Sequence, residues 1–273
     1  MRLTEYADHY CTLVGGGSGY REQLRVLVKR LPWGPADLTA ENITEYLQSA
    51  LATLQPSTVA NHRRMLITLH RHAAANGLVE ECTDKIGRVK TRPKIIRCWT
   101  HVQIQRLLGE SKKLQGRTRK CPCDYAVVMP AYILTAYSSG LRRGDLLSIE
   151  WGDLEGDRLV VSQNKTAHIH VAVLDQQCMD ALAVLPRFGK RVFGDILTKD
   201  RVKLLMRRCV DRAGLQGSGK WLRRSSATYA ELSGISATLQ LGHKTPGLAW
   251  SNYIDRVLLS EMRRPVPSLP EAG

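Results

Sequence analysis

The chain has 273 residues, of which 43% are hydrophobic and 24% are charged, so we expect a globular protein and not a disordered one. No apolar run approaches the roughly 20 residues that span a bilayer, and the polar segment 1–10 lacks the apolar core of a secretion signal. Forty Lys and Arg residues against 25 Asp and Glu residues give a net charge of +15, which points to nucleic acid as the partner and not to a membrane.

The first 80 residues have the apolar periodicity of helices. One helix is predicted over 20–31, a second from Thr39 to about residue 54, and a third over 58–76. Ser57 is the candidate N-cap of the third helix, and Gly77 is its predicted stop.

Seven cysteines form an odd set without paired spacing, which favours reduced thiols in the cytoplasm over disulfides. Cys121 and Cys123 are close in the sequence, but no matching Cys or His pair lies near them. We therefore predict no metal site.

Positive charge is concentrated in the middle of the chain. Residues 1–80 hold 8 basic and 7 acidic side chains, residues 81–120 hold 12 and 3, and residues 121–273 hold 20 and 15. Within this basic middle, 81–99 contains Gly and Pro and is predicted to be an extended linker that runs beside DNA phosphates. Two arginines of the third helix lie largely off its apolar face, where a solvated surface and a phosphate contact are equally good interpretations. The predicted DNA contacts are Arg63, Arg64, Lys90, Arg92 and Lys94.

A second domain is predicted to begin near Thr100, which forms a possible capping box with Gln103. The apolar stretch 125–137 is long enough for a buried helix, and two short strands over 159–161 and 169–173 form a hairpin. Further helices are predicted over 175–185, 198–213, 222–232 and 236–241. The fold class is therefore mainly α with a small antiparallel β-sheet.

Four short passages of this domain carry the residues of a possible active site. Residues 139–145 read S-G-L-R-R-G-D, and Asn-Lys-Thr at 164–166 falls in the turn between the two strands. Residues 220–225 read K-W-L-R-R-S, residues 241–244 read L-G-H-K, and Tyr253 follows ten residues after His243.

In this order the passages resemble the tyrosine recombinase (phage integrase) family. That family has a G-L-R-x-G-E box, a hairpin lysine, an H-x-L-R box, an L-G-H box and a tyrosine shortly afterwards. The resemblance spans the chain, and it implies a helical core-binding (SAM-like) domain over 1–80, the basic linker over 81–99 and a catalytic domain over 100–273. It also implies a site-specific recombinase, bound to DNA in the nucleoid, which forms a 3′-phosphotyrosine and a Holliday junction without metal, ATP or another cofactor.

The resemblance assigns a role to each matching residue. Tyr253 is the nucleophile, because a tyrosine hydroxyl can conserve the bond energy as a covalent phosphodiester. Two arginines would neutralise the phosphorane-like transition state, Lys165 would protonate the leaving oxygen, and Asp145 would orient Arg142. The implied catalytic set is Arg142, Lys165, Lys220, Arg223, His243 and Tyr253. The rival candidates are Arg143, Arg224 and Tyr229, and we expect Tyr229 to be a packing residue.

The sequence departs from the family pattern at several points. Lys220 replaces the first histidine of the H-x-L-R box, and Asp145 replaces the commoner Glu. The spacing from Arg223 to His243 is short, and Tyr253 is one residue further from His243 than usual. Slower or differently pH-dependent chemistry is expected, because a lysine is a poor base near neutral pH. Two alternatives stay open: a topoisomerase- or resolvase-like strand-transfer enzyme, and a catalytically impaired DNA-binding factor.

The segment after Tyr253 has an apolar stripe that must cover a surface. Its members are Ile254, Val257, Leu258 and Met262. The stripe either docks on its own domain or packs on a neighbouring protomer. The family resemblance favours the second option, which implies a dimer on each DNA site and a tetramer in the synapse.

Overall fold

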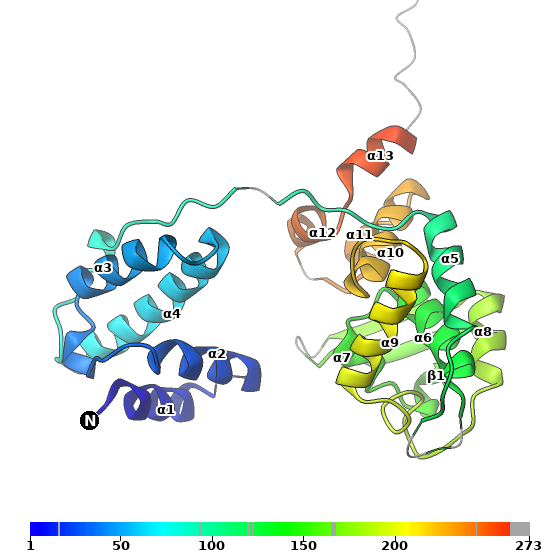
Figure 1. Cartoon of the computed structure of the whole chain (residues 1–273), viewed down its shortest axis with the longest axis horizontal. Helices are drawn as coiled ribbons and strands as arrows, with labels where there is room; N and C mark the ends of the chain where they lie inside the picture. Colours follow the sequence, from blue (N-terminus) through cyan, green and yellow to red (C-terminus); the bar gives the residue numbers. More distant parts are fainter. Residues whose placement is uncertain are drawn as a thin grey trace, which may run out of the picture. The chain divides into compact units, whose positions relative to one another are not determined.

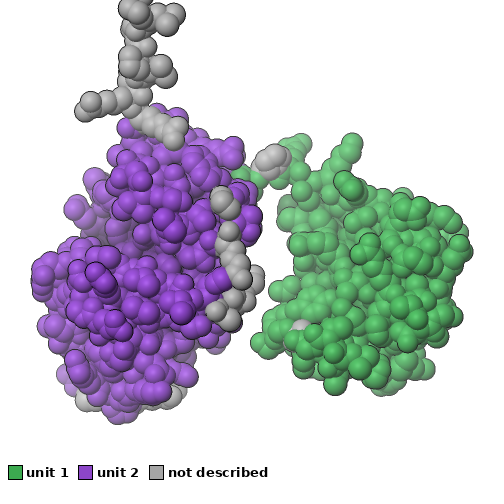
Figure 2. All heavy atoms as spheres, turned by 180° about the vertical axis from the view of Figure 1, so that it is seen from behind, with its two compact units in different colours: residues 1–94 green, residues 95–273 purple. Residues whose placement is uncertain are grey.

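The computed structural model describes all residues except 16, 93, 119, 120, 122, 165–167, 244 and 263–273. The chain divides into two compact units, residues 1–94 and residues 95–273 (Figure 2). Each unit has a hydrophobic core of its own. The prediction of a mainly α chain with a small antiparallel sheet is confirmed.

Unit 1 is helical (Figure 1), and its helices pack their apolar stripes together. Its helices are α1 (Leu3–Val14), α2 (Ser18–Val28), α3 (Ala40–Leu51) and α4 (Pro56–Ala75). Thr39 caps α3 by accepting a hydrogen bond from the Asn42 backbone N–H at 3.2 Å. Helix α4 begins at Pro56, which occupies the first turn, so the predicted cap at Ser57 is wrong and Gln55 takes that place.

The extended basic segment between the units is shorter than predicted. Ile86 is 1% exposed and belongs to the core of unit 1, while Trp99 is fully buried in unit 2. Residues 87–97 have no helix or strand, apart from residue 93, which is not described. This segment includes Arg88, Lys90, Arg92, Lys94 and Arg97, all of them exposed.

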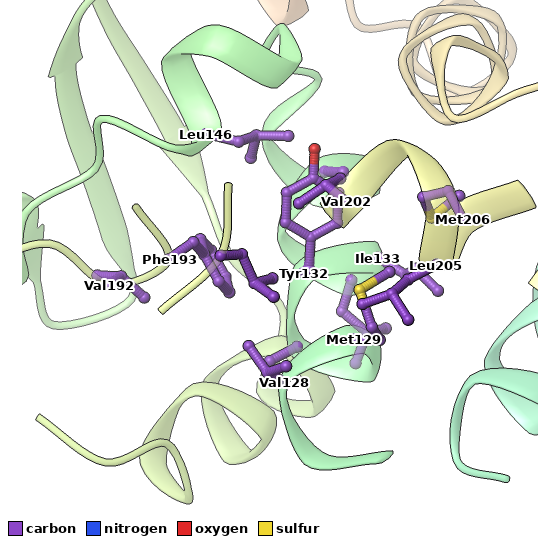
Figure 3. Close-up of a cluster of buried hydrophobic side chains, with 14 of the residues drawn as sticks. Val128, Met129, Tyr132, Ile133, Leu146, Val192, Phe193, Val202, Leu205 and Met206 are labelled. Carbon is purple, nitrogen blue, oxygen red and sulfur yellow. The ribbon is translucent and has the colours of Figure 1, made fainter. Parts of the chain in front are cut away.

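Unit 2 is built around the buried helix α6 (Tyr125–Ser139). Its Tyr132 lies among Leu146, Phe193 and Val202 (Figure 3), and the rings of Tyr132 and Phe193 meet edge to face at 5.4 Å. The other long helices are α5 (His101–Ser111), α8 (Gln176–Ala183), α9 (Lys199–Arg212) and α10 (Lys220–Leu232). The predicted capping box of Thr100 and Gln103 is present at the start of α5.

A three-stranded antiparallel sheet completes unit 2. It contains β1 (Leu154–Glu155), β2 (Arg158–Ser162) and β3 (Ile169–Val173) in that order, and Val160 is paired with Val171. Short helices carry the remaining motifs: α7 (Arg143–Leu146), α11 (Ala237–Gln240), α12 (Pro246–Asn252) and α13 (Arg256–Met262). None of the helices in the described part of the chain is long and apolar enough to cross a membrane.

Candidate active site

The first motif turns sharply at Gly140, where α6 ends. This residue has φ +61°, and a Cβ there would lie 3.0 Å from the Leu241 side chain and 3.0 Å from the Ser226 hydroxyl. Glycine is therefore needed both for its backbone conformation and for space. The turn places Arg142 at the N-cap of α7 and leaves the Gly140 carbonyl as an acceptor for Arg223.

Arg142 is held mainly by an amide and not by a carboxylate. Its Nη1 donates to Oε1 of Gln163 at 2.7 Å, and its Nη2 lies 3.3 Å from Nε2 of His243. Asp145 is 3% exposed, but its Oδ2 lies 3.9 Å from Nη1 of Arg142 and has no hydrogen-bond partner among the residues that the structure describes. Oδ1 of Asp145 instead accepts from the backbone N–H of Asn164 at 3.0 Å. The expectation that Asp145 orients Arg142 is thus revised: the two form a long ion pair, and the hydrogen bonds of Asp145 go to the hairpin turn.

Arg223 and its rival Arg224 point in different directions. Arg223 is 4% exposed and donates to the Gly140 carbonyl, to the Leu241 carbonyl at 3.2 Å and to Nε2 of His243 at 2.8 Å. Burial, helped by the nearby charge of Arg142, lowers the pKa of Arg223 to about 10. Arg224 donates to the Arg97 carbonyl at 3.1 Å instead. Of the pair, Arg223 is the one that joins Arg142.

His243 is the acceptor that the two arginines share. Because guanidinium groups only donate, Nε2 must hold a lone pair, which assigns the ring proton to Nδ1. Burial and the adjacent Arg223 and Arg142 lower the pKa of His243 to about 4, so the ring is neutral at pH 7. Nδ1 is buried and finds no hydrogen-bond partner within the described part of the chain.

Tyr253 ends α12 and closes the cluster. Its ring centroid lies 5.2 Å from that of His243 and 4.8 Å from Cζ of Arg223. Burial raises the pKa of the Tyr253 hydroxyl, but the positive charges of Arg223, Arg142 and Lys220 outweigh burial, and the net pKa is lowered. An easier loss of its proton suits a nucleophilic tyrosine. The ring of Tyr229, in contrast, stacks on His101 at 3.6 Å, and its hydroxyl accepts a backbone N–H bond, which is the packing position expected of it.

Of the two lysines predicted for the site, the structure describes Lys220 and not Lys165. Lys220 is the first residue of α10; it is exposed, and its Nζ lies 5.9 Å from the Tyr253 ring centroid. Lys165 lies outside the described residues, but β2 and β3 flank it as the predicted hairpin, and Asn164 precedes it at the site.

Four of the predicted catalytic residues line one basic cavity of about 790 Å³ in unit 2. Arg142, Lys220, Arg223 and Tyr253 all contribute to its wall. Seven basic side chains line the cavity, and Asp211 is the one acidic side chain among the lining residues described. The basic set is Arg142, Arg143, Lys199, Lys203, Arg207, Lys220 and Arg223. Such a cavity is suited to a polyanion.

Three of these basic residues were missed by the motif analysis. Lys199, Lys203 and Arg207 recur every four residues along α9, are exposed, and line the cavity together. Their spacing was visible in the sequence, but a charged stripe of this kind is usually only a solvated helix face.

The predicted DNA contacts of unit 1 separate into two groups. Arg64, Lys90, Arg92 and Lys94 are exposed. Arg63 is engaged instead, because its guanidinium donates to the carbonyls of Ile86 and Gly87 at 2.6 Å each. It fixes the start of the linker and is not free for phosphate in this structure.

The segment after Tyr253 packs partly on its own domain. Of the predicted stripe, Ile254 is buried and Leu258 is half-buried, while Val257 and Met262 are 38% and 52% exposed. Leu259, which the predicted stripe did not include, is buried in the same cluster as Ile254. The predicted stripe is therefore divided: one side contacts α10, and the other faces outward.

Comparisons with known proteins agree with this arrangement, although no family model matches the sequence. The chain is 24% identical to the integrase of Escherichia phage lambda over 258 residues, which is 86% of this chain and 69% of that protein. It is 22% identical to the integrase of Escherichia phage HK022 over 257 residues, which is 84% of this chain and 67% of that protein.

Solved structures of such enzymes share the fold over nearly the whole chain. A lambda integrase dimer bound to a COC′ core site matches with a TM-score of 0.73 and 19% identity over 100% of both chains. The Tn1549 transposon integrase in complex with circular intermediate DNA matches with a TM-score of 0.68 and 15% identity over 97% of this chain and 100% of that one. A lambda integrase tetramer bound to a Holliday junction matches with a TM-score of 0.66 and 19% identity over 90% of this chain and 78% of that one. The likeness in sequence and the shared fold both make this chain similar to phage and transposon integrases, in agreement with the resemblance of its motifs to the tyrosine recombinases.

The fold of this chain brings together five residues from motifs that are far apart in the sequence. They are Arg142, Lys220, Arg223, His243 and Tyr253. No group of three His, Cys, Asp or Glu side chains placed to hold a metal ion occurs among the residues that the structure describes.

Proposed function

We propose that this recombinase cleaves and rejoins DNA strands at specific sites through a covalent 3′-phosphotyrosine on Tyr253. The observation that carries the proposal is the convergence of two guanidinium groups and a tyrosine hydroxyl of lowered pKa on one basic cavity, with the neutral imidazole of His243 in contact with all three residues.

The proposed reaction is a transesterification. The Tyr253 oxygen forms a bond to the scissile phosphorus, and the bond from phosphorus to the 5′-oxygen breaks. The tyrosine proton passes to Nε2 of His243, and Lys165 supplies the proton that the leaving 5′-oxygen needs. Attack by a 5′-hydroxyl of the partner strand reverses these steps and reseals the backbone, so neither ATP nor a metal ion enters the balance.

Arg142 and Arg223 supply the electrostatic part of catalysis. The transition state gathers negative charge on the non-bridging oxygens of phosphorus, and preorganised donors in a site shielded from water stabilise such charge strongly. Guanidinium groups suit this role because they can donate two parallel hydrogen bonds to a phosphate. Lys220, which replaces histidine, would add a third positive charge near the phosphate.

The DNA path in unit 2 is proposed to follow the basic side chains of the cavity. Lys199, Lys203 and Arg207 would contact the phosphates beside the scissile one, and the exposed basic residues of 87–97 would extend this contact. Exchange between two sites requires four protomers, and the outward side of α13 with Val257 and Met262 is the surface proposed to join them.

The proposal is tested by trapping the covalent intermediate. A randomised duplex library, enriched on the protein by rounds of binding, supplies the DNA, and a nick next to the cleavage position lets the short fragment diffuse away. A denaturing gel should then show a protein–DNA adduct, with EDTA present, that peptide mapping assigns to Tyr253.

Two substitutions control the assignment. Tyr253→Phe should bind the DNA normally and form no adduct, while Tyr229→Phe should retain the adduct. An adduct that persists in Tyr253→Phe would refute the nucleophile. Tight binding of wild type without any adduct would favour the catalytically impaired DNA-binding factor, and Lys220→His would then be the substitution that tests for recovery.

A further inference from the structure

We propose that Gln163 is a positioning residue for catalysis, which holds Arg142 against the scissile phosphate and ties it to the hairpin that carries Lys165. This inference rests on the proposed function. It adds a residue that none of the sequence motifs contains.

Among the residues that the structure describes, Gln163 makes the shortest hydrogen bond to Arg142. Its Oε1 accepts from Nη1 of Arg142 at 2.7 Å, whereas the nearest oxygen of Asp145 is 3.9 Å away from the same nitrogen. Gln163 is fully buried, so no water competes for the amide. A buried hydrogen bond to a charged group fixes orientation firmly.

An amide is required here because the two ends of the side chain meet opposite partners. Arg142 can only donate, and the Leu241 carbonyl, which receives Nε2 of Gln163 at 3.0 Å, can only accept. The glutamine side chain reaches both partners, and its amide oxygen and nitrogen satisfy the donor and the acceptor, respectively. The amide thereby joins Arg142 to the L-G-H loop, two residues before His243.

The backbone of Gln163 extends the connection to the hairpin. Its N–H donates to the His168 carbonyl at 2.8 Å, which closes the turn that contains Lys165. The next residue, Asn164, donates to Asp145 of α7 through its backbone N–H at 3.0 Å and its side chain at 3.2 Å. Two adjacent residues of the turn thus hold the segment of Arg142 and Asp145.

The neutrality of the amide matters for the chemistry. A carboxylate 2.7 Å from Arg142 would neutralise the guanidinium and repel the phosphate, since charges at the distance of this hydrogen bond interact strongly in a buried site. Glutamine orients Arg142 and leaves its full positive charge for the transition state.

The decisive variants are Gln163→Met and Gln163→Glu. Methionine keeps the size and removes both hydrogen bonds, and glutamate keeps the acceptor for Arg142 but adds a negative charge. We expect each to slow single-turnover cleavage of the nicked duplex by about 10- to 100-fold, with DNA binding within about twofold of wild type. Gln240→Met is the matched control, because its amide also makes two partly buried hydrogen bonds, to Ser138 and Ser226, and neither involves Arg142 or Arg223.

A methylphosphonate at the cleavage position separates positioning from folding. This group lacks one negative charge, so it needs less help from Arg142. For each variant, the rate deficit is the factor by which it cleaves more slowly than wild type on the same DNA. On the methylphosphonate this deficit should shrink at least about tenfold for Gln163→Met, Gln163→Glu and Arg142→Ala. Any deficit of Gln240→Met should stay unchanged. The double variant with Gln163→Met and Arg142→Ala should cleave hardly more slowly than Arg142→Ala alone.

The outcomes separate this inference from the proposed function. If wild type forms no adduct, the proposed function fails, and the role of Gln163 fails with it. If wild type cleaves and either Gln163 variant cleaves equally fast, only the role of Gln163 is refuted. A Gln163→Met or Gln163→Glu deficit that persists on the methylphosphonate, or that multiplies fully with Arg142→Ala, would also overturn it. Thermal unfolding identifies a misfolded methionine variant, and the glutamate variant then decides.

Discussion

Removal of the Asp255 carboxylate should destabilise the segment that carries the nucleophile. Asp255 is 3% exposed and lies two residues after Tyr253. Its Oδ1 accepts from the backbone N–H groups of Val257 at 3.1 Å and Leu258 at 3.2 Å, and so caps α13. Its Oδ2 accepts from the Cys98 backbone N–H at 3.0 Å, which fastens the end of the basic segment to the same place.

The magnitude follows from these two contacts. Loss of a helix N-cap costs about 1 kcal/mol, and a buried N–H left without an acceptor at Cys98 costs about 1–3 kcal/mol. Asp255→Ala should therefore lower the free energy of unfolding of unit 2 by about 2–4 kcal/mol. Asp255→Asn is the matched control, because asparagine caps a helix as well as aspartate does but cannot accept from both sides at once. Asp255→Asn should therefore lose only the stability that comes from the hydrogen bond of the Cys98 N–H and should keep the helix cap.

Urea unfolding followed by tryptophan fluorescence measures the difference. Four of the five tryptophans (Trp99, Trp151, Trp221 and Trp250) belong to unit 2, so the signal reports mainly on that unit. The yield of the Tyr253 adduct should fall in the same order, wild type, then Asn, then Ala. A change below about 0.5 kcal/mol for Asp255→Ala, the size of an ordinary surface substitution, would refute this reasoning. Equal losses for the two variants would refute the separate contribution of the cap.

Three further predictions follow from the site. Gly242→Ala should reduce adduct formation at least about tenfold. The reason is that φ is +59° at Gly242 and that a Cβ there would lie 2.6 Å from Nε2 of Gln163. Gly247→Ala is the control: a Cβ there meets open space, so the amount of adduct on the same gel should hardly change. On folding, the pKa of His243 falls from 6.5 to about 4, so the unfolded chain takes up the proton at a higher pH than the folded chain. The stability that this shift contributes is complete above pH 6.5 and is lost as the pH falls toward 4. When the free energy of unfolding is measured against pH, His243→Gln should therefore show a smaller slope over this range. Replacing Lys203 and Arg207 with Gln should flatten the dependence of log K on log salt by up to about 0.9 per contact, while Arg208→Gln, exposed on the same helix but not lining the cavity, should leave the slope unchanged.

Local sequence signals predicted much of the secondary structure. Thr39, Thr100 and Thr198 each cap the helix that follows, because a cap depends only on a side chain and a backbone N–H a few residues away. The hairpin was predictable for the same reason: residues that alternate between the two faces identify each strand without knowledge of its partner. Helices α1, α7 and α12 were missed. For α7 and α12 the reason is that such short segments have too few turns to show a periodicity, whereas α1 spans 12 residues.

Side-chain partners within the site could not be predicted in this way. Arg63 and Arg64 are neighbours on one helix, yet Arg63 is taken up by carbonyls more than 20 residues further along the chain. Gln163, for which the sequence suggested no role, makes the contact with Arg142 that was expected of Asp145, because the hairpin brings Asn164 to the carboxylate and Gln163 to the guanidinium. Contacts of this kind depend on tertiary packing, about which the pattern of one segment carries no information.

The two hydrogen bonds that His243 receives have a consequence for the proposed reaction. Both arginines donate to Nε2 of His243, and this nitrogen is the proposed acceptor of the tyrosine proton. A phosphate oxygen carries negative charge and is a stronger acceptor than a neutral imidazole, so a bound scissile phosphate draws the guanidinium groups to itself. Their departure frees the lone pair of His243 and removes part of the positive charge that keeps the pKa of the ring low. In the proposed mechanism, binding of the phosphate would therefore free His243 to act as the base when the tyrosine proton has to leave.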